Sequence, residues 1–540
     1  MLCLALRLLQ SQHVTKLALV TGSLATAIVA SDWISGAFPL RRHIEILPAT
    51  HWSDLVPVAN QVDTCIDQAC REQNLAPLGQ ADELLIARRL TLSLHGRIPS
   101  LAEIRELEQS DDRTKLQEFA DRLLRDRRFG EHVGEVLTRS IVTNDDYDFP
   151  NPYRRVSFHR WLSNELNRNT PYDKIVRRIV AEDGLCCEHG STNFFTAFKC
   201  DPALLAAQTA RSFLATRLDC AQCHNHPFAE WKQEQFHGLA SYYSGVTQSK
   251  WQVYGEWRPY EYENHDKHVR EQIAPKPPVR PDLDPGVGEP RARLAAWITH
   301  RENPYFARAI VNSMWAMLFG RGLVEPLDDL SKPQSVPGVL DLLANDLIAH
   351  EFDLKHLLRV IVTTQAFGRA SSFDQPSTAE HESLYASFPL TRLRPNVTSL
   401  ALSQTEVATP LAESANILNR AASTSQTDGF VRTLGTPDCS EVLVTQASLT
   451  QRLLLMNGDR VEETWGIGVV ALSRQLALLC TSNEACVEAA YRACLSRRPT
   501  PTELAHFVAQ LAGPHGVNRT DCVEDMMWCL TNSSEFQWHH

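Results

Sequence analysis

The sequence lacks a long basic run, and its 540 residues carry a formal net charge of -11. Proteins whose main partner is nucleic acid usually cluster lysine and arginine, because these side chains neutralise phosphates. The charge pattern therefore argues against nucleic acid as the main partner. Hydrophobic residues make up 43% of the chain and charged residues 22%, which is typical of folded globular domains.

Long hydrophobic runs are also missing, apart from one near the N-terminus. Leu17–Ala30 is an apolar run, and Arg7 and Lys16 place positive charge before it. Its length suits the core of a signal peptide and is short for a spanning helix. The pattern predicts a signal peptide or membrane anchor over 1–30, then an extension over 31–60. We expect export to the periplasm or cell envelope, with membrane contact only through this segment.

Alternation of apolar and polar residues, the pattern of half-buried strands, is scarce. Apolar residues instead recur with a period near 3.6, as in Lys115–Asp126, Ala203–Leu218 and Val339–His350. This periodicity predicts a mostly α-helical fold.

Proline and glycine concentrate in one internal region, 245–290, which also carries many charges. Such a composition cannot hold a helix, so it predicts an extended linker, with a short hairpin around Trp251–Tyr262. The linker divides the chain into two multi-helical domains, 61–244 and 291–540.

Two helix starts are marked by capping boxes. Ser100 and Glu103 have the required spacing, and Thr500 and Glu503 repeat it, with Pro501 at the first helical position. We expect a helix to begin at each of these places.

The common catalytic signatures are absent. The chain has no Walker loop, no Gly-x-Gly-x-x-Gly, no Gly-x-Ser-x-Gly and no His-Glu-x-x-His, since His350-Glu351 lacks its second histidine. No catalytic residue is predicted, and the sequence leaves open whether the protein is an enzyme.

One short segment, LDCAQCHNHPF, concentrates reactive side chains. Cys220, Cys223 and His224 form a C-x-x-C-H motif, of which chance predicts roughly 0.01 copies in this composition. On a helix through Cys220, the residues three and four positions later lie on the same face. Thiols that bond the haem vinyl groups beside an iron-ligating imidazole are the usual interpretation, so we predict haem c with His224 as metal ligand.

Zinc is the alternative cofactor. Cys220, Cys223, His224 and His226 offer four ligands within seven residues, whereas tetrahedral zinc sites usually combine two separated pairs. A cysteine pair with this spacing is also a redox motif, although no βαβ pattern surrounds it. A zinc site would therefore require a second half-site, which His189 or a cysteine such as Cys186, Cys187 or Cys200 could supply.

The chain has 14 cysteines, and export would permit disulfides. We expect one or two bridges near the C-terminus, where five cysteines crowd together. These are Cys480, Cys486, Cys494, Cys522 and Cys529.

A haem iron needs a sixth ligand or an open position. His226 lies too close to His224 to reach the opposite face of the same iron. Met314 and Met317, in the apolar segment 312–320, are candidates because methionine is a normal axial ligand. The alternative is that both methionines fill the hydrophobic core.

Several long stretches resemble a known family. Leu90–Glu103 and Thr209–Tyr243 are similar to the first of two paired domains of unknown function in exported, planctomycete cytochrome-associated proteins. The second domain is similar to 291–372, and the similarity resumes at 446–458, 490–504 and 529–539. The resemblance implies an exported protein in which the C-x-x-C-H motif is usual, and it implies no particular reaction.

This chain departs from the family pattern at two positions, and the region Leu393–Thr409 also fits the family poorly. It has Ser313 where members typically have arginine, and Met317 where they commonly have histidine. Because histidine and methionine both ligate haem iron, we predict that Met317 approaches the motif.

Two functions follow from these features. The first is an exported c-type haem protein for electron transfer or redox sensing, with a redox partner protein. The alternative is a non-enzymatic scaffold or interaction protein of the cell envelope, in which the C-x-x-C-H segment holds a disulfide or a structural metal. The sequence does not indicate the oligomeric state.

Overall fold

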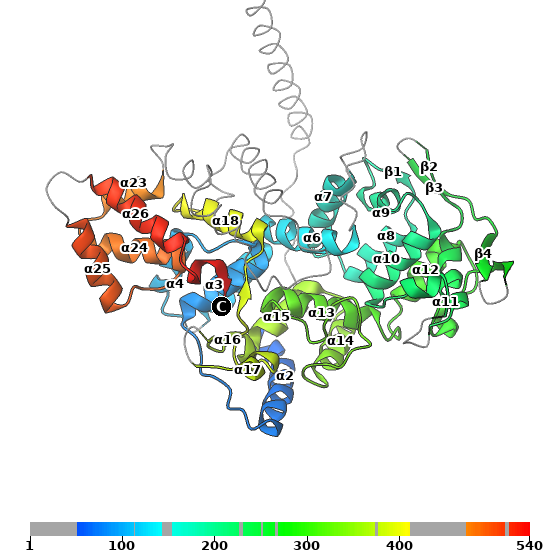
Figure 1. The fold of residues 1–540 in the computed structure, drawn as a ribbon, viewed down its shortest axis with the longest axis horizontal. Helices are drawn as coiled ribbons and strands as arrows, with labels where there is room; N and C mark the ends of the chain where they lie inside the picture. The colour runs from blue at the N-terminus through cyan, green and yellow to red at the C-terminus, as the bar shows by residue number, and fades with distance from the viewer. Residues whose placement is uncertain are drawn as a thin grey trace, which may run out of the picture. The chain divides into compact units, whose positions relative to one another are not determined.

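The computed structural model describes residues 51–112, 114–142, 154–225, 231–249, 252–264, 268–372, 376–410, 471–512 and 518–540. Most of these residues are α-helical, which confirms the predicted fold class (Figure 1). The predicted signal peptide or anchor, residues 1–30, lies outside the described residues, as do His226 and Cys439. None of the described helices combines the length and the apolar character that crossing a bilayer requires.

Helices fill the described chain before the linker, and local sequence signals set several of their ends. The predicted capping box is present at α4, where Ser100 accepts a hydrogen bond from the backbone N–H of Glu103. α10 ends at Leu214, before the predicted Leu218, because Ala215 adopts left-handed backbone with φ 44°. The helices are α2 (Trp52–Glu72), α3 (Glu83–His95), α4 (Leu101–Gln109), α5 (Lys115–Arg125), α6 (Arg127–Ile141), α7 (Arg154–Asn167), α8 (Tyr172–Ala181), α9 (Asn193–Ala197), α10 (Pro202–Leu214) and α11 (Gln233–Ala240).

Helices also dominate after the linker. The second predicted capping box is present at α25, where Thr500 and Glu503 hydrogen-bond reciprocally. The predicted helix over Val339–His350 is α14, which ends one residue earlier. The helices are α12 (Pro290–Ile298), α13 (Phe306–Phe319), α14 (Val339–Ala349), α15 (Leu354–Thr363), α16 (Gln365–Gly368), α17 (Ala379–Ser383), α18 (Pro395–Thr405), α23 (Leu472–Leu479), α24 (Asn483–Leu495), α25 (Pro501–Leu511) and α26 (Arg519–Thr531).

The linker contains more structure than predicted. The single hairpin expected around Trp251–Tyr262 is wrong, because this segment contributes one strand to each of two antiparallel hairpins. Pro259, which has no backbone N–H to donate, stands between the two hairpins. The strands are β1 (Gly184–Leu185), β2 (Val246–Ser249), β3 (Gln252–Gly255), β4 (Tyr260–Asn264), β5 (Val269–Ile273), β6 (Thr391–Arg392) and β7 (Trp538–His539), ordered β1-β3-β2, β4-β5 and β6-β7.

Segments on opposite sides of the linker are in direct contact. Arg88 on α3 is fully buried, and its guanidinium donates to the backbone carbonyls of Cys494 and Phe536 at 3.0 and 3.1 Å. Lys355 on α15 reaches back to the carbonyl of Asn167. The described residues from His51 to His540 therefore form one packed unit.

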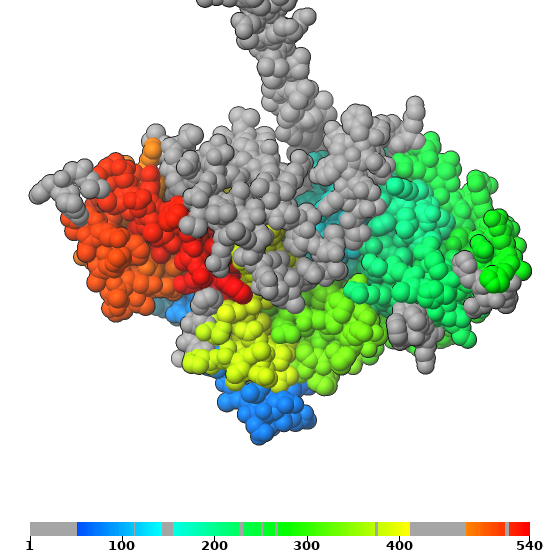
Figure 2. Space-filling model, viewed as in Figure 1, coloured from blue at the N-terminus to red at the C-terminus, as the bar shows by residue number. Residues whose placement is uncertain are grey.

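Two clusters of buried apolar side chains form the cores. The larger one extends from α2 to Phe388. In the smaller one, Leu92, Ile98 and Leu101 pack with the helices α18, α23, α24 and α26. Figure 2 shows the helices from α23 to α26, orange to red, as a continuous mass.

Candidate functional site

The C-x-x-C-H motif lies in a short 3₁₀ helix, η2 (Asp219–Gln222), and the turn that follows it. The predicted α-helix through Cys220 is wrong, because the left-handed Ala215 has already ended α10. Because η2 ends at Gln222, Cys220 lies within the 3₁₀ helix and Cys223 lies at its C-cap. His224 lies in the bend that follows Cys223.

All three side chains of the motif are accessible. Cys220, Cys223 and His224 are exposed, and both cysteines are free thiols. Accessible thiols can react with a haem vinyl group, with a metal ion or with each other. The arrangement therefore suits each of the chemistries that the sequence left open.

The tautomer of His224 follows from its hydrogen bond. Its Nδ1 lies 2.8 Å from the backbone carbonyl oxygen of Asn225. A carbonyl can only accept, so Nδ1 carries the proton, and the neutral ring keeps its lone pair on Nε2. Metal-ligating histidines in proteins commonly have this arrangement.

The segment before the motif is fixed to residues beyond the linker. Arg217 donates two hydrogen bonds to the carboxylate of Asp328, from Nε at 2.8 Å and Nη2 at 2.7 Å. These bonds raise the pKa of the Arg217 guanidinium. The carbonyl of Ala215 accepts from the N–H of Leu330 at 2.9 Å. Asp328 thus anchors the segment that leads to Cys220.

The end of η2 is fixed by α11. The carbonyl of Gln222 accepts from Nε2 of His237 at 3.0 Å and from the side-chain amide of Gln233 at 3.2 Å. Because Nε2 of His237 donates, its Nδ1 accepts from the hydroxyl of Tyr260 at 3.0 Å. Burial raises the pKa of Tyr260 to about 12, so this hydroxyl keeps its proton at neutral pH. The motif is thus held on both sides by polar contacts.

Met317 is placed differently from the other predicted site residues. It lies in the last turn of α13, is 9% exposed and belongs to the larger hydrophobic core. Met314, on the same helix, is completely buried. Ser313 donates a hydrogen bond to the carbonyl of Ala309 within the helix. Ligation of iron by Met317 stays a prediction.

The described residues offer one group of three metal-ligand side chains whose ligand atoms lie within 4.8 Å of one another: Asp346, His350 and His356. We call it the Asp346–His350–His356 cluster. Cys220 and Cys223 do not join such a group within the described residues, and His226 lies outside them. Within the described residues, no such group includes the residues considered for a second zinc half-site, which are Cys186, Cys187, His189 and Cys200.

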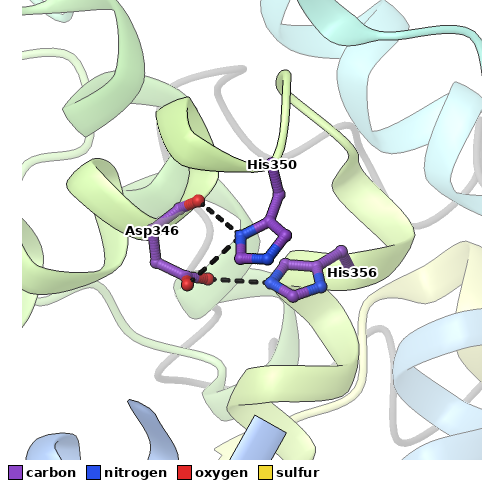
Figure 3. Close-up of side chains that lie close together, drawn as sticks. All are labelled: Asp346, His350 and His356. Carbon is purple, nitrogen blue, oxygen red and sulfur yellow. Dashed lines mark hydrogen bonds and ion pairs between the residues drawn. The ribbon is translucent and has the colours of Figure 1, made fainter. Parts of the chain in front are cut away.

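The Asp346–His350–His356 cluster lies where α14 meets α15 (Figure 3). Nε2 of His356 donates to Oδ2 of Asp346 at 2.9 Å. Nδ1 of His350 lies 2.9 Å from the backbone carbonyl of Asp346 and 3.3 Å from its Oδ1. The two imidazole rings are stacked, with centroids 3.6 Å apart and planes inclined by 21°.

Sequence reasoning missed this cluster. His350-Glu351 does not complete a His-Glu-x-x-His pattern, because the second histidine of the cluster, His356, lies on the next helix. The connecting residues Glu351 and Phe352 both adopt left-handed backbone, with φ 54° and 59°. No sequence rule for this turn was available, and only the DxxxHxxxxxH spacing itself could have signalled the cluster.

The C-terminal cysteines do not form the predicted disulfides. Within the described chain, Cys480, Cys486, Cys494, Cys522 and Cys529 are all free thiols. Burial, followed by the nearby Cys480, raises the pKa of the Cys486 thiol to about 11. This thiol is therefore protonated and unreactive near neutral pH.

Two family models match the chain. PSCyt2, a protein of unknown function (DUF1549), matches residues 61–248, which include the C-x-x-C-H motif. PSD1, a protein of unknown function (DUF1553), matches residues 290–406, which include Met317 and the Asp346–His350–His356 cluster. No curated protein and no solved structure matches the chain. The chain therefore belongs to the planctomycete cytochrome-associated family built from these two paired domains of unknown function.

Proposed function

We propose that the protein is an exported c-type haem protein that transfers electrons or senses redox state. Cys220 and Cys223 would form the two thioether bonds, and His224 would ligate the iron through Nε2. Each bond joins the sulfur to one vinyl carbon, while the thiol hydrogen goes to the other. When bound, the haem supplies one-electron chemistry at its iron.

The observation that carries the proposal is the hydrogen bond from Nδ1 of His224 to the carbonyl of Asn225. It leaves the Nε2 lone pair for a metal, on the residue that directly follows Cys223 and four positions after Cys220, and both of these thiols are exposed. These donors match those of a c-type haem site. The anchors at Arg217 and Gln222 would hold the segment in place during electron transfer.

Met317 is the proposed sixth ligand. Its thioether is the donor type that completes many c-type haem sites and raises their reduction potential. Because the side chain is 9% exposed within a core helix, ligation requires the site to open toward α13. The physiological partner would be a protein that exchanges single electrons in the cell envelope.

The direct test is expression of the full chain, with its N-terminal segment, in a bacterium that attaches c-type haem. The expected product is red, keeps its haem through denaturing electrophoresis and shows different absorption spectra when reduced and oxidised. Cys220→Ala or Cys223→Ala should leave one thioether, and the double variant none. Cys187→Ala, which removes another exposed thiol, is the matched control.

Axial ligation needs a separate readout. His224→Ala should change the spectrum of the attached haem, while Met317→Leu should remove any band that depends on a methionine ligand. If the exported chain is colourless and has no haem bound to Cys220 or Cys223, the proposal fails. A disulfide or a metal at the cysteines would then favour the scaffold alternative.

A further inference from the structure

We propose that the Asp346–His350–His356 cluster binds a divalent transition-metal ion, with zinc as the ion that fits its donors. One carboxylate and two imidazoles form a common three-ligand set for such ions, which often leaves the remaining position for water or substrate. This site lies in the second of the two domains and does not depend on haem at Cys220.

The distances between donor atoms suit a single ion. Two ligands about 2.05 Å from zinc in tetrahedral geometry lie about 3.3 Å apart. In the cluster, Oδ2 of Asp346 and Nε2 of His356 are 2.9 Å apart, and Oδ1 of Asp346 and Nδ1 of His350 are 3.3 Å apart. One ion could replace the shared protons after small shifts of the ligand atoms and a rotation of the half-exposed His350 ring, whose plane is now inclined by only 21° to that of His356.

The backbone holds the ligands before any ion arrives. Asp353 caps α15 by accepting from the N–H of His356 at 2.9 Å, and its other oxygen accepts from the side chain of Asn169 at 3.0 Å. The N–H of Phe352 donates to the carbonyl of Leu347 at 2.9 Å. These bonds fix the tight connection between the helices, so little ordering would accompany metal binding.

The three side chains of the cluster differ in exposure, so the site is accessible to solvent on the side of His350. The side chains of Asp346 and His356 are 8% and 7% exposed, whereas that of His350 is 48% exposed. With neutral imidazoles the cluster carries one negative charge, which a divalent cation complements. Binding through Nε2 of His356 would release the proton that this atom now donates to Asp346.

The same contacts also describe a clasp without metal, in which His350 caps the end of α14 and His356 bonds to Asp346. Metal binding separates the two cases, because a clasp gains no stability from zinc. The experiment uses the full chain without a histidine tag and with Cys220→Ala and Cys223→Ala, which removes the other candidate metal site. Haem results therefore cannot decide the outcome.

Two measurements test the proposal on this protein. Titration calorimetry with zinc should show one site that His350→Ala weakens at least about tenfold, since even outer partners of metal ligands change affinity by this factor. Zinc should also raise the unfolding midpoint, and this rise should disappear in the same variant. Cobalt should give visible absorption bands that depend on His350.

Two further variants sharpen the test. Asp346→Asn keeps an oxygen that accepts from His356 but loses the negative charge, so it should fold normally and bind zinc weakly. His506→Ala removes an exposed histidine on α25 and should bind zinc like its parent. Equal zinc affinity and equal midpoint shifts in the parent and in His350→Ala would show a clasp only and overturn the proposal.

Discussion

Arg89 donates a 2.7 Å hydrogen bond from Nε to the backbone carbonyl of His540, which lies 451 positions later in the sequence. Its Nη1 donates to the carbonyls of Phe367 and Arg369 at 3.0 and 2.7 Å. The guanidinium is completely buried and lies over the ring of Phe388, 3.9 Å from its centre. A single side chain thus joins α3, the segment from α16 to Arg369, and His540, which follows β7.

Replacing Arg89 by methionine should destabilise the protein strongly. The methionine fills similar space but leaves three buried carbonyls without this donor, and each buried acceptor left unpaired costs about 1–3 kcal/mol. We expect the free energy of unfolding to fall by about 3 kcal/mol or more, measured by urea denaturation. Arg105→Met, at an exposed position on α4, is the control and should change stability little. Similar stabilities of the two variants would contradict the role of Arg89.

Stability should fall as the pH is lowered from 7.5 to 5.5. Burial lowers the pKa values of His95, His132 and His539 to about 3, whereas an unfolded histidine has a pKa of about 6.5. Between these values the unfolded chain binds protons that the folded chain does not, so acid favours unfolding. Each histidine should contribute a loss of about 1.4 kcal/mol over this range.

The pH effect can be assigned with two variants. His132→Gln should reduce the dependence of the unfolding free energy on pH by roughly one histidine's contribution, whereas His506→Gln, at an exposed position, should leave it unchanged. Identical pH profiles for the parent and His132→Gln would show that His132 binds protons equally in the folded and unfolded protein, and would contradict the lowered pKa. Working above pH 5.5 limits the contribution of carboxylates.

The features that could be predicted from sequence are local ones. The period of apolar residues gave α5 to within one residue, and both capping boxes are present, because each depends on residues at most a few positions apart. The C-x-x-C-H motif was also identifiable, since its residues are adjacent. The backbone conformation of the motif could not be predicted, because the left-handed residue that ends α10 is Ala215, whereas glycine or asparagine is the usual sequence signal for this conformation.

The remaining features depend on contacts between distant segments. The Asp346–His350–His356 cluster exists only because the Glu351–Phe352 turn folds α15 back toward α14. Arg88 and Arg89 resemble ordinary surface arginines of an amphipathic helix, yet both bind carbonyls from the C-terminal part of the chain. A single sequence carries no local signal for such partners.

Removing the capping hydroxyls should test whether the two similar helix starts contribute equally to the free energy of unfolding. Ser100→Ala should cost about 2 kcal/mol and Thr500→Ala about 1 kcal/mol, the upper and middle of the usual range. Ser100 is 1% exposed, so the N–H of Glu103 would lose its acceptor away from water, whereas Thr500 is exposed. Urea denaturation of both variants measures the difference. A larger loss from Thr500→Ala would contradict this order.

Alkylation of the native protein should distinguish the state of the motif cysteines. Burial raises the pKa of Cys494 to about 12, and that of Cys486 to about 11, so these thiols should react with iodoacetamide at least about 100-fold more slowly than exposed Cys187. In protein without a cofactor, Cys220 and Cys223 should react like Cys187. Mass spectrometry of the peptides measures all five positions in one sample.

Protection of Cys220 and Cys223 in protein from the exporting host would then identify what they hold. Covalent haem adds the mass of haem to the peptide and survives reduction, a disulfide disappears on reduction, and a bound metal is released by a chelator. Labelling of Cys486 or Cys494 under native conditions would contradict their burial. Rapid labelling of both motif cysteines in the exported protein would mean that haem is not attached there, because a thioether sulfur has no thiol left to alkylate.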